Sequence, residues 1–362
     1  MNEFHFSSTR LANPPHVQRG LIARISAALC VLSMVGACVH QHAMTTAGPG
    51  LAEIIAHPGD AHRASTGEDR PIEVASLLGV GLRRPFLDSM AAAPRERNLA
   101  AAAAALLVSP TNSDALLRYG VSLAALGRYR EAIDTLAVGI RLFPNEPRFY
   151  RERAQQYLIV RRPALSIADF QKAALLMRSK PDEPDAIRQP NAVGAGGVRD
   201  FQPSTFHLSV WYNLAVALYV RGDYGNALLM LDSADISGPD NTARVAIAYW
   251  RYLSLKRTGR DAEAVKTLAI ANGNLDAGET VAYLRALQLF AGQTTADALL
   301  PKRGAETTTA NEAVVSYGVS MYYLFGGQKA VAREIWKRMM DTNAWPSHGV
   351  LSAESELERL RK

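Results

Sequence analysis

The sequence predicts an all-α fold, in which pairs of helices repeat along an extended array. The first observation is an internal period of 34 residues, which relates Gly120 to Ala154, Ala132 to Ser166, and Leu136 to Phe170. The second is the size of the chain, because 362 residues leave room for one extended array or for two compact domains. A period of this length is typical of helix pairs that bury their apolar faces by stacking on one another.

Six repeat units follow from this period. Their boundaries are 113–146, 147–180, 208–241, 245–278, 279–312 and 313–346. The twentieth place of every unit holds a small residue: Ala132, Ser166, Ala227, Ala264, Ala298 and Ala332. Since a small side chain lets two helices approach closely, this place supports the interpretation as helix pairs.

Two units carry a more specific pattern. The first reads LLRYG at 116–120 and GRYREAI at 127–133, and the third reads WYNLA at 211–215 and GDYGNA at 222–227. These segments resemble the tetratricopeptide repeat (TPR), and the resemblance extends over 113–346. It implies a TPR-like α-solenoid, a right-handed superhelix of helix-turn-helix repeats. It also implies a non-catalytic scaffold that binds protein or peptide partners in a concave groove.

The segments around the repeats complete the predicted architecture. An Ala/Leu-rich stretch, Arg95–Val108, suits a capping helix, so we assign 71–112 to N-terminal capping helices and 347–362 to a C-terminal capping helix. The insertion 181–207 is rich in proline and glycine, which disfavour a helix. It could cover part of the groove as a lid, or it could be a spacer.

The N-terminal segment resembles a targeting signal. An uncharged apolar stretch, Ile25–Cys38, follows a basic region and is too short to cross a bilayer. Its end, Val35-Gly36-Ala37-Cys38, resembles the bacterial lipobox. The alternatives are an ordinary cleavage site and a buried core helix.

The lipobox resemblance implies a specific location. Residues 1–37 would be a lipoprotein signal peptide, Cys38 would carry the lipid, and 38–70 would be a flexible tether. Val39 after the cysteine favours the outer membrane, so the protein is expected in the periplasm, anchored to that membrane. Segments such as YYLFGG at 322–327 are similar to those of bacterial TPR lipoproteins of the periplasm.

The candidate binding residues come from the TPR resemblance. In such solenoids the second, fifth, ninth and twelfth residues of the first helix of each unit line the groove. The fifth place reads Leu117, Arg151, Tyr212, Tyr249, Tyr283 and Tyr317. The predicted partner-binding residues are therefore Arg148, Arg151, Tyr212, Asn213, Tyr249, Tyr283 and Tyr317.

Two other interpretations of the tyrosines remain open. They could pack between neighbouring helices or hold the insertion 181–207 against the groove. Alternatively, aromatic rings along a groove could stack on sugars, which would suit a glycan- or peptidoglycan-binding envelope protein. The arginines Arg148 and Arg151 could meet an acidic group or a C-terminal carboxylate.

No catalytic motif stands out. The sequence has no Gly-x-Ser-x-Gly, no His-Glu-x-x-His and no phosphate-binding loop, and its two cysteines cannot form a four-cysteine zinc site. The net charge of +6 is spread along the chain, so it does not point to nucleic acid. We therefore expect no enzyme activity, no cofactor, no metal and no nucleic acid partner, with an accessory subunit of an envelope hydrolase as an alternative.

Overall fold

The computed structural model describes residues 69–185, 201–238, 240–273, 275–300 and 309–361. The chain divides into two units, Met1–Gly50 and Leu51–Lys362, and every described residue belongs to the second. The predicted signal peptide 1–37, the lipidation site Cys38 and nearly all of the tether 38–70 lie outside the described residues.

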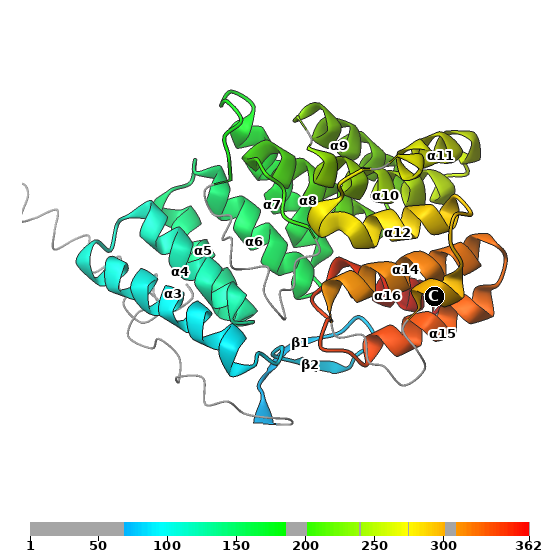
Figure 1. Ribbon diagram of the computed structural model, residues 1–362. Coiled ribbons are helices and arrows are strands. Elements are labelled where there is room, and N and C mark those ends of the chain that lie inside the picture. The colour runs from blue at the N-terminus through cyan, green and yellow to red at the C-terminus, as the bar shows by residue number, and fades with distance from the viewer. Residues whose placement is uncertain (1–68, 186–200, 239, 274, 301–308, 362) are drawn as a thin grey trace, which may run out of the picture. The chain divides into compact units, whose positions relative to one another are not determined.

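The described residues form an all-α, TPR-like solenoid of antiparallel helix pairs (Figure 1). The first helices of the pairs are α4 (Ser113–Ala125), α6 (Pro147–Ile159), α8 (Phe206–Arg221), α10 (Asn241–Arg257), α12 (Val281–Phe290) and α14 (Ala310–Phe325). The second helices are α5 (Tyr129–Leu142), α7 (Pro163–Met177), α9 (Tyr224–Ile236), α11 (Asp261–Thr267), α13 (Ala296–Leu299) and α15 (Lys329–Met340). Two 3-10 turns, η2 (Leu268–Asn272) and η3 (Gly278–Thr280), lie between α11 and α12. Each pair packs on the next, because both helices present apolar faces that a single pair cannot bury.

Small residues allow the close packing. Ala132, Ser166, Ala227, Ala264 and Ala332, at the twentieth place of their units, are fully buried. Gly139 shows how tight the contact is: a Cβ atom there would lie 2.2 Å from the ring of Phe149 on the next pair. Ala298 is exposed, which agrees with the short α13 of the fifth pair.

The turns inside the pairs share one backbone conformation. Five of them contain a glycine with positive φ: Gly127, Gly222, Gly259, Gly292 and Gly327. The second pair is different, because Arg161 occupies the corresponding place with φ 61°. Among the described residues Arg161 is the one non-glycine residue with positive φ, a conformation that costs a side chain roughly 1–2 kcal/mol.

The segment before the repeats corrects one expectation. The stretch 71–112 is not made of helices throughout, because it begins with an antiparallel hairpin of β1 (Ile72–Ala75) and β2 (Gly81–Arg83). Gly79, with φ 86°, forms the turn, and the buried Val74 ties the hairpin to the core. One helix, α3 (Ser89–Val108), follows and packs on α4.

The last helix corrects another expectation. Helix α16 (His348–Arg359) packs on α14 and α15, as a terminal cap would, but it also packs on α8. Its residues Gly349–Leu357 are all buried. A cap keeps a polar outer face in water, whereas α16 is enclosed by the repeats. Gly349 permits this, since a Cβ atom there would lie 2.5 Å from the carbonyl oxygen of Ala313.

Candidate binding groove

The four predicted tyrosines do not form an open surface. Tyr212, Tyr249, Tyr283 and Tyr317 are each 0% exposed, so the expectation that they line an accessible partner-binding groove is wrong for this structure. Their rings pack between neighbouring first helices, for example Tyr249 edge-to-face on Tyr283 at 5.1 Å. Apolar rings at one repeated place gain more from stacking against each other than from exposure to water.

Hydrogen bonds within the protein occupy the tyrosine hydroxyls. Tyr212 donates to the hydroxyl of Tyr283 (3.3 Å) and accepts from the indole nitrogen of Trp250 (2.9 Å). Tyr249 donates to the carbonyl oxygen of Val314 (3.3 Å). A sugar therefore cannot stack on these rings, and the glycan-binding alternative loses the feature that suggested it.

Other parts of the chain cover the tyrosines. Phe201, at one end of the insertion 181–207, packs edge-to-face on Tyr212 at 4.9 Å. His348, the first residue of α16, lies 6.5 Å from the same ring, and the hydroxyl of Tyr317 donates to Glu356 of α16 at 3.5 Å. The groove face of the later repeats is thus filled by the insertion and by α16.

This enclosure changes the acidity of two tyrosines. The hydroxyls of Tyr219 and Tyr317 are 2.9 Å apart. Burial raises the pKa of both well above the ordinary value, and the carboxylate of Glu356 raises it further. Both hydroxyls therefore stay protonated at physiological pH.

Arg151 is also enclosed. Its guanidinium is 1% exposed, lies 2.7 Å from Glu152, forms an ion pair with Asp185 and donates to Ser209 at 3.0 Å. Burial alone would lower the pKa of Arg151, but Glu152 and Asp185 raise it overall. Asp185 belongs to the insertion, so an acidic group of the chain itself meets this arginine. The predicted residue Asn213 is buried nearby and donates to the carbonyl oxygen of Ser209 at 2.8 Å.

The described ends of the insertion lie against the repeats. Asp185 donates through its backbone to Ser204 at 3.0 Å, and Gln202 donates to Glu279 at 3.1 Å. Thr205 caps α8 by accepting a hydrogen bond from the backbone nitrogen of Leu208. Residues 186–200 lie outside the described residues.

A small cavity remains beside the insertion. Its volume is about 40 Å³, and its lining includes Asp185, Gln202, Asn213 and His348. This volume holds only a few water molecules, so the cavity offers no room for a partner.

Arg148 differs from the other predicted residues because it reaches solvent. Its side chain is 30% exposed and pairs with Asp114 and Glu146, each at 2.8 Å. The hydrogen bond to Glu146 is the largest cause that raises the pKa of Arg148. Arg148 also lines a hollow that is much larger than the cavity beside the insertion.

This hollow, which we call the N-terminal hollow, has a volume of about 570 Å³. It is lined by Asn98, Ala101, Ala102 and Ala105 of α3, by Asn112, Asp114, Ala115, Leu117, Arg118, Val121 and Ser122 at α4, and by Arg148 of α6. Asp114, Leu117 and Val121 hold the second, fifth and ninth places of the first unit. The hollow is therefore the groove face of the first repeat.

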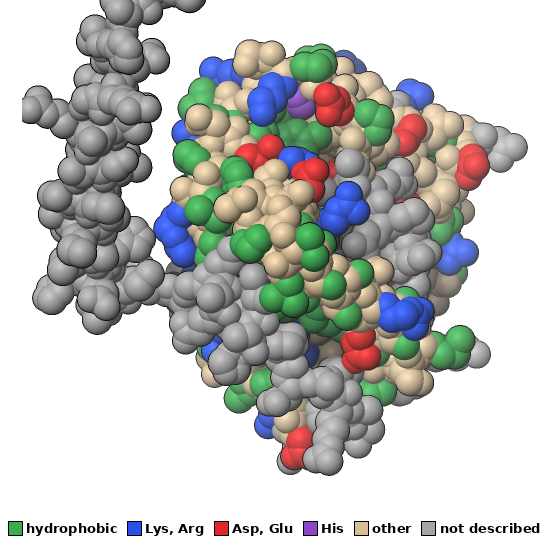
Figure 2. Space-filling model, turned by 90° about the vertical axis from the view of Figure 1, so that its left-hand side faces the viewer, with side chains coloured by type: hydrophobic (Ala, Val, Ile, Leu, Met, Phe, Trp, Pro, Cys, Tyr) green, Lys and Arg blue, Asp and Glu red, His purple; other side chains and the backbone are tan. Residues whose placement is uncertain are grey.

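The lining combines apolar and polar groups. The alanines of α3 bring no bulk, so a bound chain could approach the helix closely. Arg118 is exposed and brings a guanidinium with several donors. Figure 2 shows acidic and basic side chains mixed with hydrophobic ones on the side of the molecule where α3 to α5 lie, without a large area of one charge.

Sequence reasoning missed most of this hollow. It singled out Arg148, yet the repeat register already placed Asp114, Leu117 and Val121 on the groove face. The tyrosines recur at the fifth place of four units, and such recurrence is expected equally of a binding position and of a packing position.

Two further kinds of feature, a metal site and a membrane-spanning helix, are absent from the described residues. These residues contain no group of three or more His, Cys, Asp or Glu residues placed to hold a metal ion. Among them, no helix has the length and apolar character needed to cross a membrane.

A comparison with protein-family models agrees with the first helix pair. A tetratricopeptide repeat model matches residues 114–146, which include α4 and α5, and α4 lines the N-terminal hollow. One similar solved structure is described as the crystal structure of YrrB, a TPR protein with an unusual peptide-binding site. It has 14% sequence identity, covers 67% of this chain and 91% of that chain, and has a TM-score of 0.38. No curated protein matches the sequence. The described helices thus form a TPR-like solenoid, and its first helix pair matches the tetratricopeptide repeat itself.

Proposed function

We propose that this protein is a non-catalytic scaffold that binds a peptide segment of a partner protein in the N-terminal hollow. The observation that carries the proposal is that groove-face residues of the matched repeat line a hollow of about 570 Å³. The groove faces of later repeats are filled by Phe201, Asp185 and α16. Tetratricopeptide repeats support a role in protein interaction, and the hollow supplies a place for it.

The lining favours a short peptide with an acidic group. The guanidinium of Arg118 can pair with a carboxylate through two parallel hydrogen bonds. The small side chains of Ala101 and Ala105 leave space for the peptide backbone, while the largely buried Leu117 and Val121 close the hollow from below. Arg148, which is already paired with Asp114 and Glu146, would form one edge of the peptide-binding site.

The test introduces a bulky side chain into the hollow and measures peptide binding. Acidic peptides are first selected from a random library on the full chain, and their affinity is then measured by fluorescence anisotropy. Ala105→Trp places a large ring in the hollow and should weaken binding by about tenfold or more, as should Arg118→Glu. Ala100→Trp is the matched control, because Ala100 is exposed on α3 and does not line the hollow. Equal affinity for Ala105→Trp, Arg118→Glu and the control would refute the proposal.

We further propose that the protein is a lipoprotein of the outer membrane, attached through Cys38 and facing the periplasm. The support is the sequence Val35–Cys38 at the end of an apolar stretch, since a cysteine that carries two acyl chains anchors a protein stably. Cys38→Ala should move the protein from the membrane fraction to the soluble periplasmic fraction and abolish fatty-acid labelling. Cys30→Ala is the control, and labelling that survives Cys38→Ala would reject the anchor.

A further inference from the structure

Helix α16 is unusual for an enclosed helix. Its residues Gly349–Leu357 are buried on every side, and helices in such surroundings are generally apolar. Four of these residues are instead polar or charged: Ser352, Glu354, Ser355 and Glu356. The helix therefore depends on groups around it that recognise its polar side chains.

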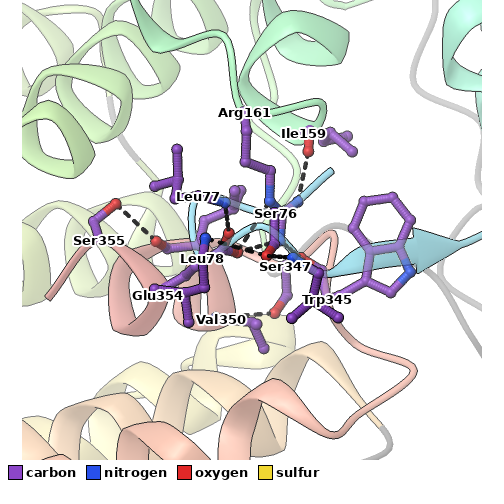
Figure 3. Close-up of polar contacts among 12 residues, drawn as sticks. Ser76, Leu77, Leu78, Ile159, Arg161, Trp345, Ser347, Val350, Glu354 and Ser355 are labelled. Carbon is purple, nitrogen blue, oxygen red and sulfur yellow. Dashed lines mark hydrogen bonds and ion pairs between the residues drawn. The ribbon is translucent and has the colours of Figure 1, made fainter. Parts of the chain in front are cut away.

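Glu354 is held by the turn of the second pair (Figure 3). Its carboxylate accepts from the Nε and Nη2 atoms of Arg161, at 3.0 and 2.6 Å, and from the backbone nitrogen of Leu77 at 2.5 Å. Arg161 also donates to the carbonyl oxygen of Trp345 and lies over its ring at 5.0 Å. Both charged side chains are almost fully buried, at 2% and 1% exposed.

The contact between Arg161 and Glu354 comes with a strained backbone conformation at Arg161. The corresponding turns of the other five pairs contain glycine, which adopts positive φ freely. Here a strained arginine is present, and its side chain reaches the carboxylate of α16. Strained residues of this kind are found at ligand clamps and switches more often than elsewhere.

Glu356 is held from the other side. Its carboxylate accepts from Arg257 of α10 at 3.0 Å, and it also accepts from Arg359 of α16 itself at 2.8 Å. Burial alone would lower the pKa of Arg257, but Glu356 raises it overall. Residues i and i+2 of a helix point to nearly opposite sides, so Glu354 and Glu356 are contacted from two directions, by Arg161 and by Arg257.

We propose that these residues form a receptor for an acidic helix, in which α16 is the resident ligand that a partner helix can replace. The receptor consists of the α6–α7 turn with Arg161, together with α8, α10, α14 and α15. The partner is a protein helix that carries two carboxylates two residues apart, as Glu354 and Glu356 are. This receptor is separate from the N-terminal hollow, with which it shares no lining residue.

The chemistry of the contact points to specificity rather than to added stability. An apolar helix would fill the same space at least as stably, because burying paired charges gains little over burying hydrophobic groups. Paired charges instead give specificity, since a helix without the two carboxylates leaves Arg161 and Arg257 without these partners. The receptor thus selects a charge pattern.

The first measurement uses the unmodified full chain. Hydrogen exchange should show that the amides of α16 exchange at least about tenfold faster than those of α8 and α10, although all three helices are buried. Equal protection of the three helices would show that α16 is a permanent part of the core and would overturn the proposal.

The second measurement weakens the resident helix. The full chain with Glu354→Gln and Glu356→Gln is mixed with a labelled peptide of sequence 346–361, which should displace α16. The variant should bind this peptide at least about tenfold more tightly than the unmodified chain does. The same peptide with both glutamates changed to glutamine is the control and should bind at least tenfold more weakly. Equal binding of the two peptides, or none of either, would contradict the receptor.

A third variant guards against loss of the fold. Arg161→Gly gives the turn the residue that the other turns contain, so we expect the helical circular dichroism to be retained while α16 exchanges faster. Arg153→Ala is the control, because Arg153 pairs with Asp169 and the structure records no contact between it and α16. Unchanged exchange of α16 in Arg161→Gly would also overturn the proposal.

Discussion

Arg161 and Glu354 form a buried ion pair between residues 193 positions apart in the sequence, with Nη2 and Oε2 2.6 Å apart. The pair joins the turn of the second helix pair to the last helix, so it links an early repeat to the C-terminal helix of the array. A pair over such a distance closes a long loop and makes the early and late repeats depend on each other.

Removing one partner of this pair should destabilise the protein strongly. We expect Glu354→Gln to lower the free energy of unfolding by about 3 kcal/mol, because it leaves a buried guanidinium without its counter-charge. Urea denaturation of the full chain measures the change. Glu334→Gln is the control, since Glu334 pairs with Lys337 on the surface and should change stability by less than about 1 kcal/mol.

Arg161→Gly should be milder than Glu354→Gln, although it removes the same ion pair. Glycine relieves the positive φ of this turn, which recovers roughly 1 kcal/mol of the loss. Arg161→Ala keeps the strained conformation and should be the less stable of the two. An alanine variant as stable as the glycine variant would show that the turn is not strained.

The packing between the first two pairs gives another prediction. Gly139→Ala should lower the free energy of unfolding by about 1–3 kcal/mol, because the new methyl group would meet the ring of Phe149. Gly225→Ala in α9 is the matched control, as a Cβ atom there meets nothing within 4 Å. The control should be neutral or stabilising by up to about 1 kcal/mol, since alanine favours a helix. Thermal denaturation separates the two results.

The buried tyrosines predict a loss of stability at high pH. Burial raises the pKa of Tyr219 and Tyr317 above the unfolded value of 10.0, so the folded state keeps protons that the unfolded state releases. The stability from these groups is complete below pH 10 and falls as the pH rises above it, by up to about 1.4 kcal/mol per pH unit for each group. Urea denaturation between about pH 9 and 11 measures this slope. This is roughly the range in which an unfolded tyrosine titrates.

Substitution identifies the tyrosine responsible. Tyr317→Phe should reduce the alkaline slope, because the variant lacks the buried hydroxyl whose pKa is raised. A slope that Tyr317→Phe does not alter would mean that Tyr317 is accessible to water and ionises normally.

The sequence predicted the helix pairs well because their packing is local. Small residues such as Ala132 and Ala227 recur at one place, and that place is buried in the structure. The burial of Tyr249 could not be predicted in this way. It depends on α16 and on the insertion, which are far from it in the sequence and outside the repeat pattern.

Two other features had weaker signals. Arg161 stands where Gly127 and Gly222 stand in neighbouring units, so the repeat register could have marked it as exceptional. The hairpin of β1 and β2 consists of two very short strands, and nothing in its composition distinguishes them from a loop. Its place is set by contacts such as Trp345 donating to the carbonyl oxygen of Arg83 at 2.8 Å.

Hydrogen exchange with a selected acidic peptide bound to the full chain tests the proposed function most directly. We expect the peptide to slow exchange in the lining segments of α3 and α4, around Ala101 and Arg118, and to leave α8 and α10 unchanged. Protection confined to α8, α10 or α14, or no protection at all, would contradict binding in the N-terminal hollow.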